Sequence, residues 1–158
     1  MPNSLANNNQ AKIQTVMGLD FGAAKMGISL GNTLTRNARP LMQFAMQNGK
    51  PDWQALLSLI KQWQATTIVV GLPLNMDGTI SPMGLRAKKF ARRLKHELQT
   101  CHYQCDVVVF DERLSSREAK NLAWEYGLIK TKNDPIDSIA SAILLGSWLR
   151  SGDGEYLL

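Results

Sequence analysis

The succession of strand and helix patterns constrains the fold of this chain most strongly. Three short segments rich in apolar residues come first, separated by turns that contain Gly or Asn; they are residues 13–20, 26–30 and 39–46. Short strands joined by tight turns favour an antiparallel meander. From Pro51 onward, helical and strand patterns alternate, which favours parallel strands connected by helices. The chain is therefore predicted to form a mixed sheet with helices packed against it.

The alternating part of the chain predicts four helices and two strands. The helices are expected from Pro51 to about residue 63, from Ser81 to about 100, from Ser115 to about 127 and from Asp134 to about 150, and the strands at residues 67–71 and 106–110. Ser81 and Ser115, at the starts of two of these helices, are typical N-cap residues. The whole order predicts a five-stranded sheet, three antiparallel strands and then two parallel ones, flanked by helices. This is the layout of an RNase H-like domain.

The length of 158 residues fits one domain with its own hydrophobic core, which we place at residues 15–150. Residues 1–14 are polar and rich in Asn, and residues 151–158 contain two glycines. A disordered N-terminal tail and a flexible C-terminal tail are expected there. The sequence shows neither the layout of a secretory signal nor an apolar run long enough to cross a bilayer, so we expect a cytoplasmic protein.

Three carboxylates stand at the ends of predicted elements, where a rigid scaffold can bring them together. Asp20 closes the first strand, Glu112 follows the fifth, and Asp137 lies in the first turn of the last helix. Neighbouring carboxylates raise each other's pKa unless a cation neutralises them, and hard divalent ions prefer oxygen ligands. Two such ions can activate a water and stabilise a leaving oxygen. The set therefore favours phosphodiester hydrolysis.

Each of these carboxylates also has a structural interpretation. An Asp at a strand end is often a turn former, which applies to Asp20. Glu112 could be a solvated residue before a helix. Asp137 lies near a helix N-terminus, where the helix dipole stabilises a negative charge. Taken singly, none of the three identifies a metal site.

A cluster of basic residues lies on the helix predicted from residue 81 to about residue 100. It consists of Arg86, Lys88, Lys89, Arg92, Arg93 and Lys95. We expect an apolar stripe on the same helix to face the core; its residues are Leu85, Ala87, Phe90, Ala91, Leu94 and Leu98. The cluster contains no acid before Glu97, and the whole chain carries a net charge of +5. A nucleic acid would relieve the repulsion, although a solvated helix face is the common alternative.

Five short strings, in order along the chain, carry a resemblance to a known family. They are GLDFG at residues 18–22, MGIS at 26–29, VGLPLNMDG at 70–78, DERLSS at 111–116 and IDSIA at 136–140. Together they closely resemble the YqgF family, also called RuvX, whose members are described as pre-16S ribosomal RNA nucleases or Holliday junction resolvases. The resemblance covers about residues 15–150.

The resemblance implies an RNase H-like nuclease that depends on Mg²⁺ or Mn²⁺. The residues that match the family's motifs, Asp20, Glu112 and Asp137, would be both catalytic and metal-binding. The implied role is maturation of the 5′ end of pre-16S ribosomal RNA, so the main expected partner is RNA. The older family name implies four-way DNA junctions instead, and a non-catalytic nucleic-acid-binding module is a third interpretation. A monomer or a weak homodimer is expected.

Five basic residues are predicted to contact nucleic acid: Lys25, Arg86, Lys89, Arg93 and Arg113. Two positions depart from the family pattern. Ala24 stands where many members carry Lys, which leaves Lys25 as the base of that loop. Asp134 adds a carboxylate before Pro135, where it is either a fourth metal ligand or, as we favour, a helix cap.

Overall fold

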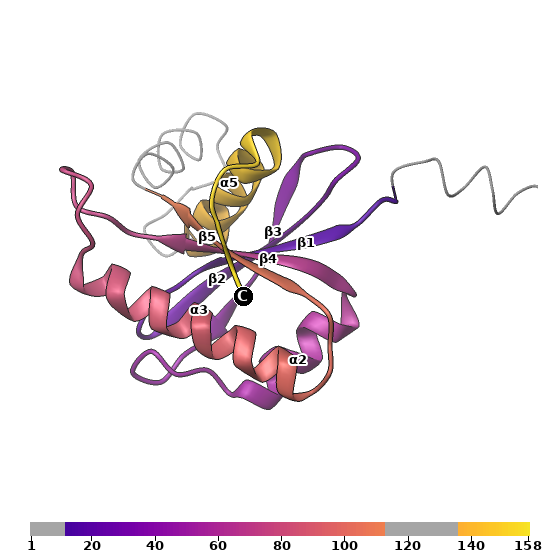
Figure 1. Ribbon diagram of the computed structural model, residues 1–158, viewed down its shortest axis with the longest axis horizontal. Coiled ribbons are helices and arrows are strands. Elements are labelled where there is room, and N and C mark those ends of the chain that lie inside the picture. Colours follow the sequence, from indigo (N-terminus) through magenta and orange to yellow (C-terminus); the bar gives the residue numbers. More distant parts are fainter. Residues whose placement is uncertain (1–11, 113–135) are drawn as a thin grey trace, which may run out of the picture.

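The computed structural model describes residues 12–112 and 136–158, with the side chains of residues 136 and 137 left undescribed (Figure 1). The elements, labelled as in Figure 1, are β1 (Thr15–Asp20), β2 (Lys25–Asn32), β3 (Ala38–Ala45), α2 (Trp53–Gln62), β4 (Ala65–Leu72), α3 (Pro82–Thr100), β5 (Asp106–Asp111), α5 (Ile136–Ser151) and β6 (Glu155–Leu157). The helix predicted at residues 115–127 lies outside the described residues, as does the Asp134–Pro135 cap.

One mixed sheet runs through the molecule in the strand order β3-β2-β1-β4-β5-β6. Strands β1, β2 and β3 pair antiparallel, whereas β4 lies parallel to both β1 and β5. The predicted fold class is thus confirmed. Since β1, β4 and β5 are parallel, their carboxyl ends meet at one edge of the sheet, and Asp20 and Asp111 end two of these strands there.

The predicted number of strands is wrong by one, because the sheet has six strands within the described residues. Residues Glu155–Leu157, which we expected to lie in a flexible tail, form β6 and pair antiparallel with β5. Val107 pairs with Leu157, which packs against the core. A three-residue strand is too short to show an alternating pattern, and it is stabilised here by the open edge of β5.

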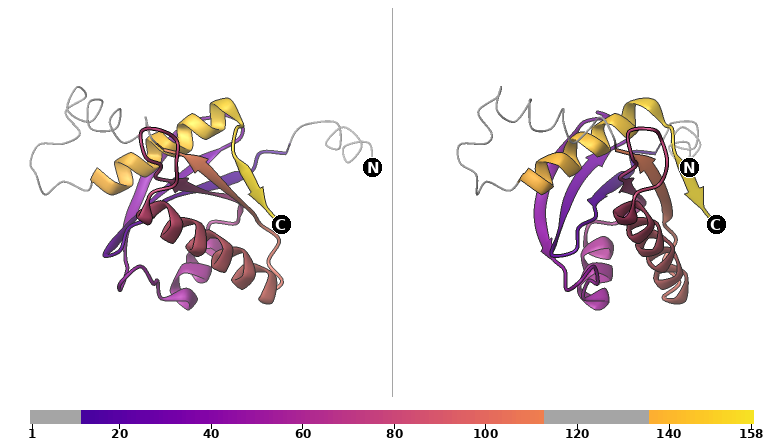
Figure 2. Two further views of the ribbon diagram at one scale, coloured as in Figure 1. Left: turned by 60° about the vertical axis from the view of Figure 1, so that its left-hand side comes forward. Right: turned by 90° about the vertical axis from the view of Figure 1, so that its left-hand side faces the viewer.

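Helices cover both faces of the sheet, with α2 and α3 on one face and α5 on the other (Figures 1 and 2). The α2/α3 face holds the larger hydrophobic cluster, to which β1 contributes Met17 and Leu19 and α3 contributes Leu94 and Leu98. None of the described helices is long and apolar enough to span a membrane.

Helix α3 begins as its sequence predicts. The Ser81 hydroxyl accepts a hydrogen bond from Gly84 N at 2.9 Å and donates one to Pro73 O at 2.6 Å, and Pro82 is the first helical residue. The predicted apolar stripe is buried except for Leu85, which is 54% exposed. At 3.6 residues per turn, Leu85 lies about 160° around the helix from Ala87, so its assignment to the stripe was wrong.

The α5 face is packed closely and contains buried hydroxyl groups. Ser29 on β2 and Ser141 on α5 are joined by a hydrogen bond of 2.8 Å. A Cβ at Gly18 on β1 would lie 2.9 Å from the Leu145 Cβ and 3.2 Å from Ser141 O. The absence of a side chain at Gly18 therefore allows α5 to lie directly on β1.

Candidate active site

Two of the three predicted carboxylates come together at the carboxyl edge of the sheet. Asp20 ends β1 and Glu112 directly follows β5, with β4 between the two strands. The side chains nevertheless meet, because a hydrogen bond joins Glu112 to Asp20. Glu112 is held at the edge by its backbone, whose N–H donates to Leu72 O at 3.3 Å.

Gly71 on β4 is what allows this contact. Leu19 pairs with Val70, so Asp20 and Gly71 come next on neighbouring strands. A Cβ at Gly71 would overlap the Glu112 Oε2 atom and would lie 2.8 Å from Leu144 Cδ2. Glu112 therefore reaches Asp20 by crossing β4 over a glycine. Our sequence reasoning missed this role, although a Gly at the end of an otherwise β-branched strand was a usable signal.

The two carboxyl groups are too close together for both to carry a charge at low cost. The pKa of the Glu112 carboxyl is raised to about 8, first by burial, then by the charge of Asp20, the hydrogen bond with Asp20 and the charge of Asp111. Since that hydrogen bond raises the pKa of Glu112, protonated Glu112 is the donor of the bond and the Asp20 carboxylate is the acceptor. A divalent cation would take the place of this shared proton, and both side chains offer the oxygen ligands that Mg²⁺ and Mn²⁺ prefer. The two residues thus fit a metal.

The third predicted residue, Asp137, lies in the first turn of α5, but its side chain is outside the described residues. Among the residues that are described, no group of three or more His, Cys, Asp and Glu side chains is placed to hold a metal ion. The structure thus brings Asp20 and Glu112 together and leaves the third ligand undescribed.

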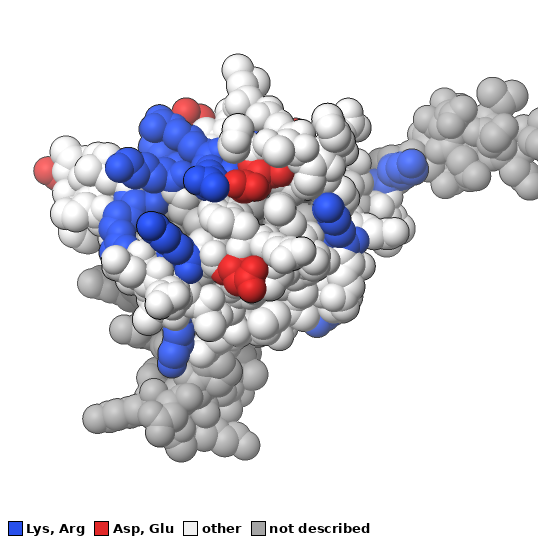
Figure 3. Space-filling model, turned by 90° about the horizontal axis from the view of Figure 1, so that it is seen from below, with Lys and Arg blue, Asp and Glu red and all other residues white. Residues whose placement is uncertain are grey.

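Three predicted nucleic-acid contacts lie on one flank of α3. Arg86, Lys89 and Arg93 all line the same groove, and the Lys and Arg side chains gather on this side of the molecule (Figure 3). Arg93 is also paired with Glu97 at 2.7 Å, so its charge is partly compensated, contrary to our interpretation of this stretch as free of such compensation. Lys25 is exposed at the start of β2, and Arg113 lies outside the described residues.

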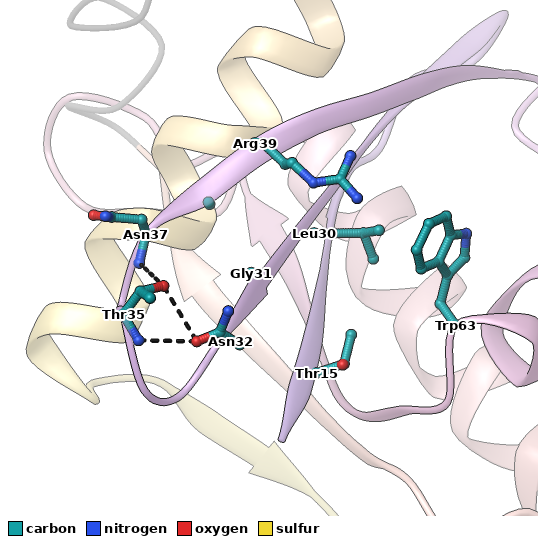
Figure 4. Close-up of a pocket in the computed structure, with 9 residues that line it drawn as sticks. Thr15, Leu30, Gly31, Asn32, Thr35, Asn37, Arg39 and Trp63 are labelled. Atoms are coloured by element: carbon teal, nitrogen blue, oxygen red, sulfur yellow. Dashed lines mark hydrogen bonds between the residues drawn. The ribbon is translucent and has the colours of Figure 1, made fainter. Parts of the chain in front are cut away.

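A separate pocket of about 300 Å³ lies at the other end of β1, beside its first residue Thr15 (Figure 4). The Arg39 guanidinium lies 5.6 Å from the centre of the Trp63 ring there, beside the turn that follows β2. Because the pocket is at the amino end of β1, it is separate from the carboxylates at the carboxyl end.

Comparison with known proteins identifies the family. The model of a family described as "RuvX: Holliday junction resolvase" matches residues 14–151. The chain belongs to the RuvX family. This confirms the resemblance carried by the five sequence strings.

Relatives of high identity share one name, "Putative pre-16S rRNA nuclease". The protein of this name from Psychrobacter sp. (strain PRwf-1) is 54% identical over 142 residues, covering 89% of this chain and 80% of that protein. The one from Acinetobacter baylyi is 41% identical over 155 residues, covering 98% of each chain.

Solved structures of resolvases share the fold at low sequence identity. Thermus thermophilus RuvC in complex with a Holliday junction substrate aligns with a TM-score of 0.57 and 15% identity, over 91% of this chain and 99% of that one. The yeast mitochondrial Holliday junction resolvase Ydc2 aligns with a TM-score of 0.53 and 12% identity, over 87% and 78%. The RNase H-like fold and the family together support a nuclease that hydrolyses phosphodiester bonds.

Proposed function

We propose that this RuvX protein is a divalent-metal-dependent endonuclease that cleaves RNA during maturation of the 5′ end of pre-16S ribosomal RNA in the cytoplasm. The observation that carries the proposal is the contact between Asp20 and Glu112 across Gly71. Holding two acids together in a half-buried position is costly unless they bind a cation. The name shared by its relatives supports a ribosomal RNA precursor as the substrate.

We propose Asp20, Glu112 and Asp137 as the residues that hold Mg²⁺ or Mn²⁺. The direction of α5 supports the third. Gly31 pairs with Val16 near the start of β1, and a Cβ added at Gly31 would meet Leu149 near the end of α5. A Cβ added at Gly18, further along β1, would meet Ser141, which comes earlier in α5. Going toward its N-terminus, α5 therefore runs along β1 toward Asp20. One helical turn before Ser141, the helix reaches the first turn that contains Asp137.

A bound metal would supply Lewis-acid stabilisation of the phosphate and a water of lowered pKa. The chain's own residues do the rest. When a metal binds, Glu112 would release to water the proton that it shares with Asp20, and both carboxylates could then serve as ligands. Gly71 keeps the space in which the two carboxylates meet. Lys25, Arg86, Lys89, Arg93 and Arg113 are proposed to hold the phosphates on either side of the bond that is cut, with the enzyme acting as a monomer or a weak homodimer.

A four-way DNA junction is the second candidate substrate. The family description and the titles of the RuvC and Ydc2 structures favour it. Symmetric cleavage of a junction would require two copies of the site, related by a two-fold axis. A module that binds nucleic acid without cutting it is a third candidate, and the presence of the Asp20–Glu112 carboxylate pair argues against it.

The test compares cleavage of a single-stranded RNA carrying a pre-16S leader with cleavage of junction DNA, in Mn²⁺ and in EDTA. We expect RNA cleavage that EDTA abolishes and that Asp20→Asn reduces by about 10³-fold, because a metal contributes several kcal/mol to the transition state. Asp106→Asn, at the amino end of β5, is the matched control and should retain activity. Cleavage that survives both EDTA and Asp20→Asn would contradict the metal mechanism, and symmetric nicking of junctions alone would favour the resolvase.

A further inference from the structure

A groove of about 670 Å³ lies between α3 and residues 46–52, the segment that joins β3 to α2. Helix α3 contributes Arg86, Lys89, Phe90 and Arg93 to its lining, and the joining segment contributes Asn48, Gly49, Lys50 and Pro51. Trp53 and Phe21 complete it. The groove is therefore built from parts of the chain that are far apart in sequence.

The joining segment is fixed in shape. Gln47 N donates to Lys50 O at 2.8 Å and Lys50 N donates to Gln47 O at 3.0 Å, which closes a two-residue turn. Asn48 and Gly49 at its centre have φ values of 52° and 78°, the conformation for which an Asn-Gly pair is preferred. A Cβ at Gly49 would lie 2.5 Å from the Arg86 Nη2 atom. The glycine thus lets Arg86 pack against the turn, where it donates to Asn48 O at 3.0 Å.

An aromatic stack lies under the basic residues of the groove. The Phe21 and Phe90 rings are 5.2 Å apart, and Trp53 stacks on Phe90 at 5.5 Å with an angle of 18° between the ring planes. The Arg93 guanidinium lies 5.7 Å from the centre of the Trp53 ring. Trp53 is only partly buried, so part of its ring lies near the surface together with the planar Arg93 cation.

The charge of the groove selects an anionic ligand. Lys50, Arg86, Lys89 and Arg93 line it, and none of the described residues in its lining is acidic. Glu97 on α3 neutralises Arg93 only. Basic residues around an aromatic surface are the combination that binds single-stranded nucleic acid, because phosphates meet the cations while bases stack on the rings.

The loop after Asp20 joins the carboxylate end of β1 to the groove. Its aromatic residue Phe21 immediately follows Asp20. Gly49 N donates to Ala23 O at 2.8 Å, and Met46 N donates to Ala24 O at 2.9 Å, so the joining segment is bound to the loop after Asp20. A strand that leaves the carboxylate pair can cross this loop and enter the groove on the α2/α3 side of the sheet.

We propose that this groove binds the single-stranded segment of the RNA substrate next to the cleaved bond. Lys50, Arg86 and Lys89 contact its phosphates, and one base packs against Trp53 and Arg93. The proposal rests on the proposed function for the identity of the RNA. It adds to that function a built binding site, with Lys50 and Trp53 as new contact residues, and a preference for single strands over duplexes.

The test measures the affinity of a fluorescein-labelled RNA of about 12 nucleotides, single-stranded or annealed to its complement, in EDTA so that nothing is cut. Lys50→Ala/Lys89→Ala removes two charges that line the groove, and Lys12→Ala/Lys61→Ala removes two exposed charges that do not. We expect the first variant to bind the single strand about 10-fold or more weakly and to reduce the salt slope by about 1.4, or about 0.7 per lost phosphate contact. The control variant should change the affinity less than about twofold. Equal losses in both variants, or equal affinity of the wild type for duplex, would overturn the proposal.

A second readout locates the base. Binding of the single strand should quench the intrinsic tryptophan fluorescence of the wild-type protein. The variant Trp53→Phe, which keeps an aromatic ring, should lose most of that quenching. Quenching that persists in Trp53→Phe would contradict contact at Trp53. Failure of this proposal is distinguishable from failure of the proposed function, because binding is measured in EDTA, where nothing is cut, and cleavage is measured separately. If the groove variants alter binding but no RNA is ever cleaved, only the proposed function fails.

Discussion

The two faces of the sheet use different kinds of residues. The α2/α3 face is filled with large apolar side chains such as Leu94 and Leu98. The α5 face has a smaller apolar cluster, which includes Val16, Leu145 and Trp148. It differs in also carrying the buried serines Ser29 and Ser141, and Gly18, where an added Cβ would strike α5. Asp20 lies two residues after Gly18 on the same strand, so its side chain emerges on this α5 face, because successive side chains alternate across a sheet.

The comparison indicates that the two faces contribute differently, one mainly to stability and the other to the close approach of the carboxylates. Large apolar side chains stabilise the fold in proportion to the area that they bury. Small residues give up some of that stability and allow helix, strand and carboxylates to approach closely. Four substitutions test this division, ordered here by their expected effect on the free energy of unfolding.

Leu98→Ala removes a fully buried side chain from the α2/α3 face, far from the carboxyl ends of the strands. We expect the free energy of unfolding to fall by about 2–5 kcal/mol, since the helix and sheet close only partly around the cavity. Urea titration measures this loss. Nuclease activity per folded molecule should stay within about twofold of the wild type, and a large loss of activity would mean that the faces are not separate.

Gly71→Ala places a methyl group where the Glu112 carboxylate crosses β4. We expect a loss of about 1–3 kcal/mol from overpacking and at least about a 10-fold loss of activity, because Glu112 is displaced from Asp20. The matched control is Gly146→Ala in α5. Among the described residues, the three atoms nearest to a Cβ there all belong to the flexible Arg150 side chain, the nearest at 3.3 Å, so the change should be neutral or stabilising. Full activity in Gly71→Ala would contradict the role of the glycine.

Glu112→Gln should stabilise the metal-free protein while abolishing activity. The pKa of the Glu112 carboxyl in the folded protein is about 8, above its ordinary value of 4.5. At a pH between these two values, the native state therefore holds a proton that the unfolded state has lost. Wild-type stability therefore falls as the pH rises from about 4.5 to about 8. We expect the variant to be more stable by about 1–3 kcal/mol at about pH 8 and no different near about pH 4.5. Thermal melts in EDTA across this range test the sign, and a wild type that is the more stable protein at the upper end would contradict it.

Ser141→Ala should have the smallest effect, a loss of about 1 kcal/mol, because it leaves the Ser29 hydroxyl without this partner in a buried place. The double change Ser29→Ala/Ser141→Ala should cost less than the two single changes added together. Activity should be unaffected in each. Strictly additive losses in the double-mutant cycle would show that the hydrogen bond contributes nothing by itself.

Within the described residues, the prediction from sequence was most accurate where the signal is local, as for helix α3. Helix α3 begins at Pro82 and ends at Thr100 as predicted, because its Ser-Pro cap and its apolar stripe are formed by residues close together in the sequence. Leu85 was misassigned because the helical angle was not applied to it. Strand β6 was missed because three residues carry no readable period.

The sequence alone determined the order of the elements from β1 to β5, the family, and which acidic residues stand at the ends of the strands. The tertiary structure alone decided that Glu112 crosses β4 to meet Asp20, that Gly71 makes this possible, and that α3 and the Asn48–Gly49 turn enclose one basic groove. The physical reason is the distance along the chain over which each interaction acts. Helix caps and hydrophobic periods act between neighbours in the chain, whereas a carboxylate pair depends on strand order and register, which are fixed only when the whole sheet has formed.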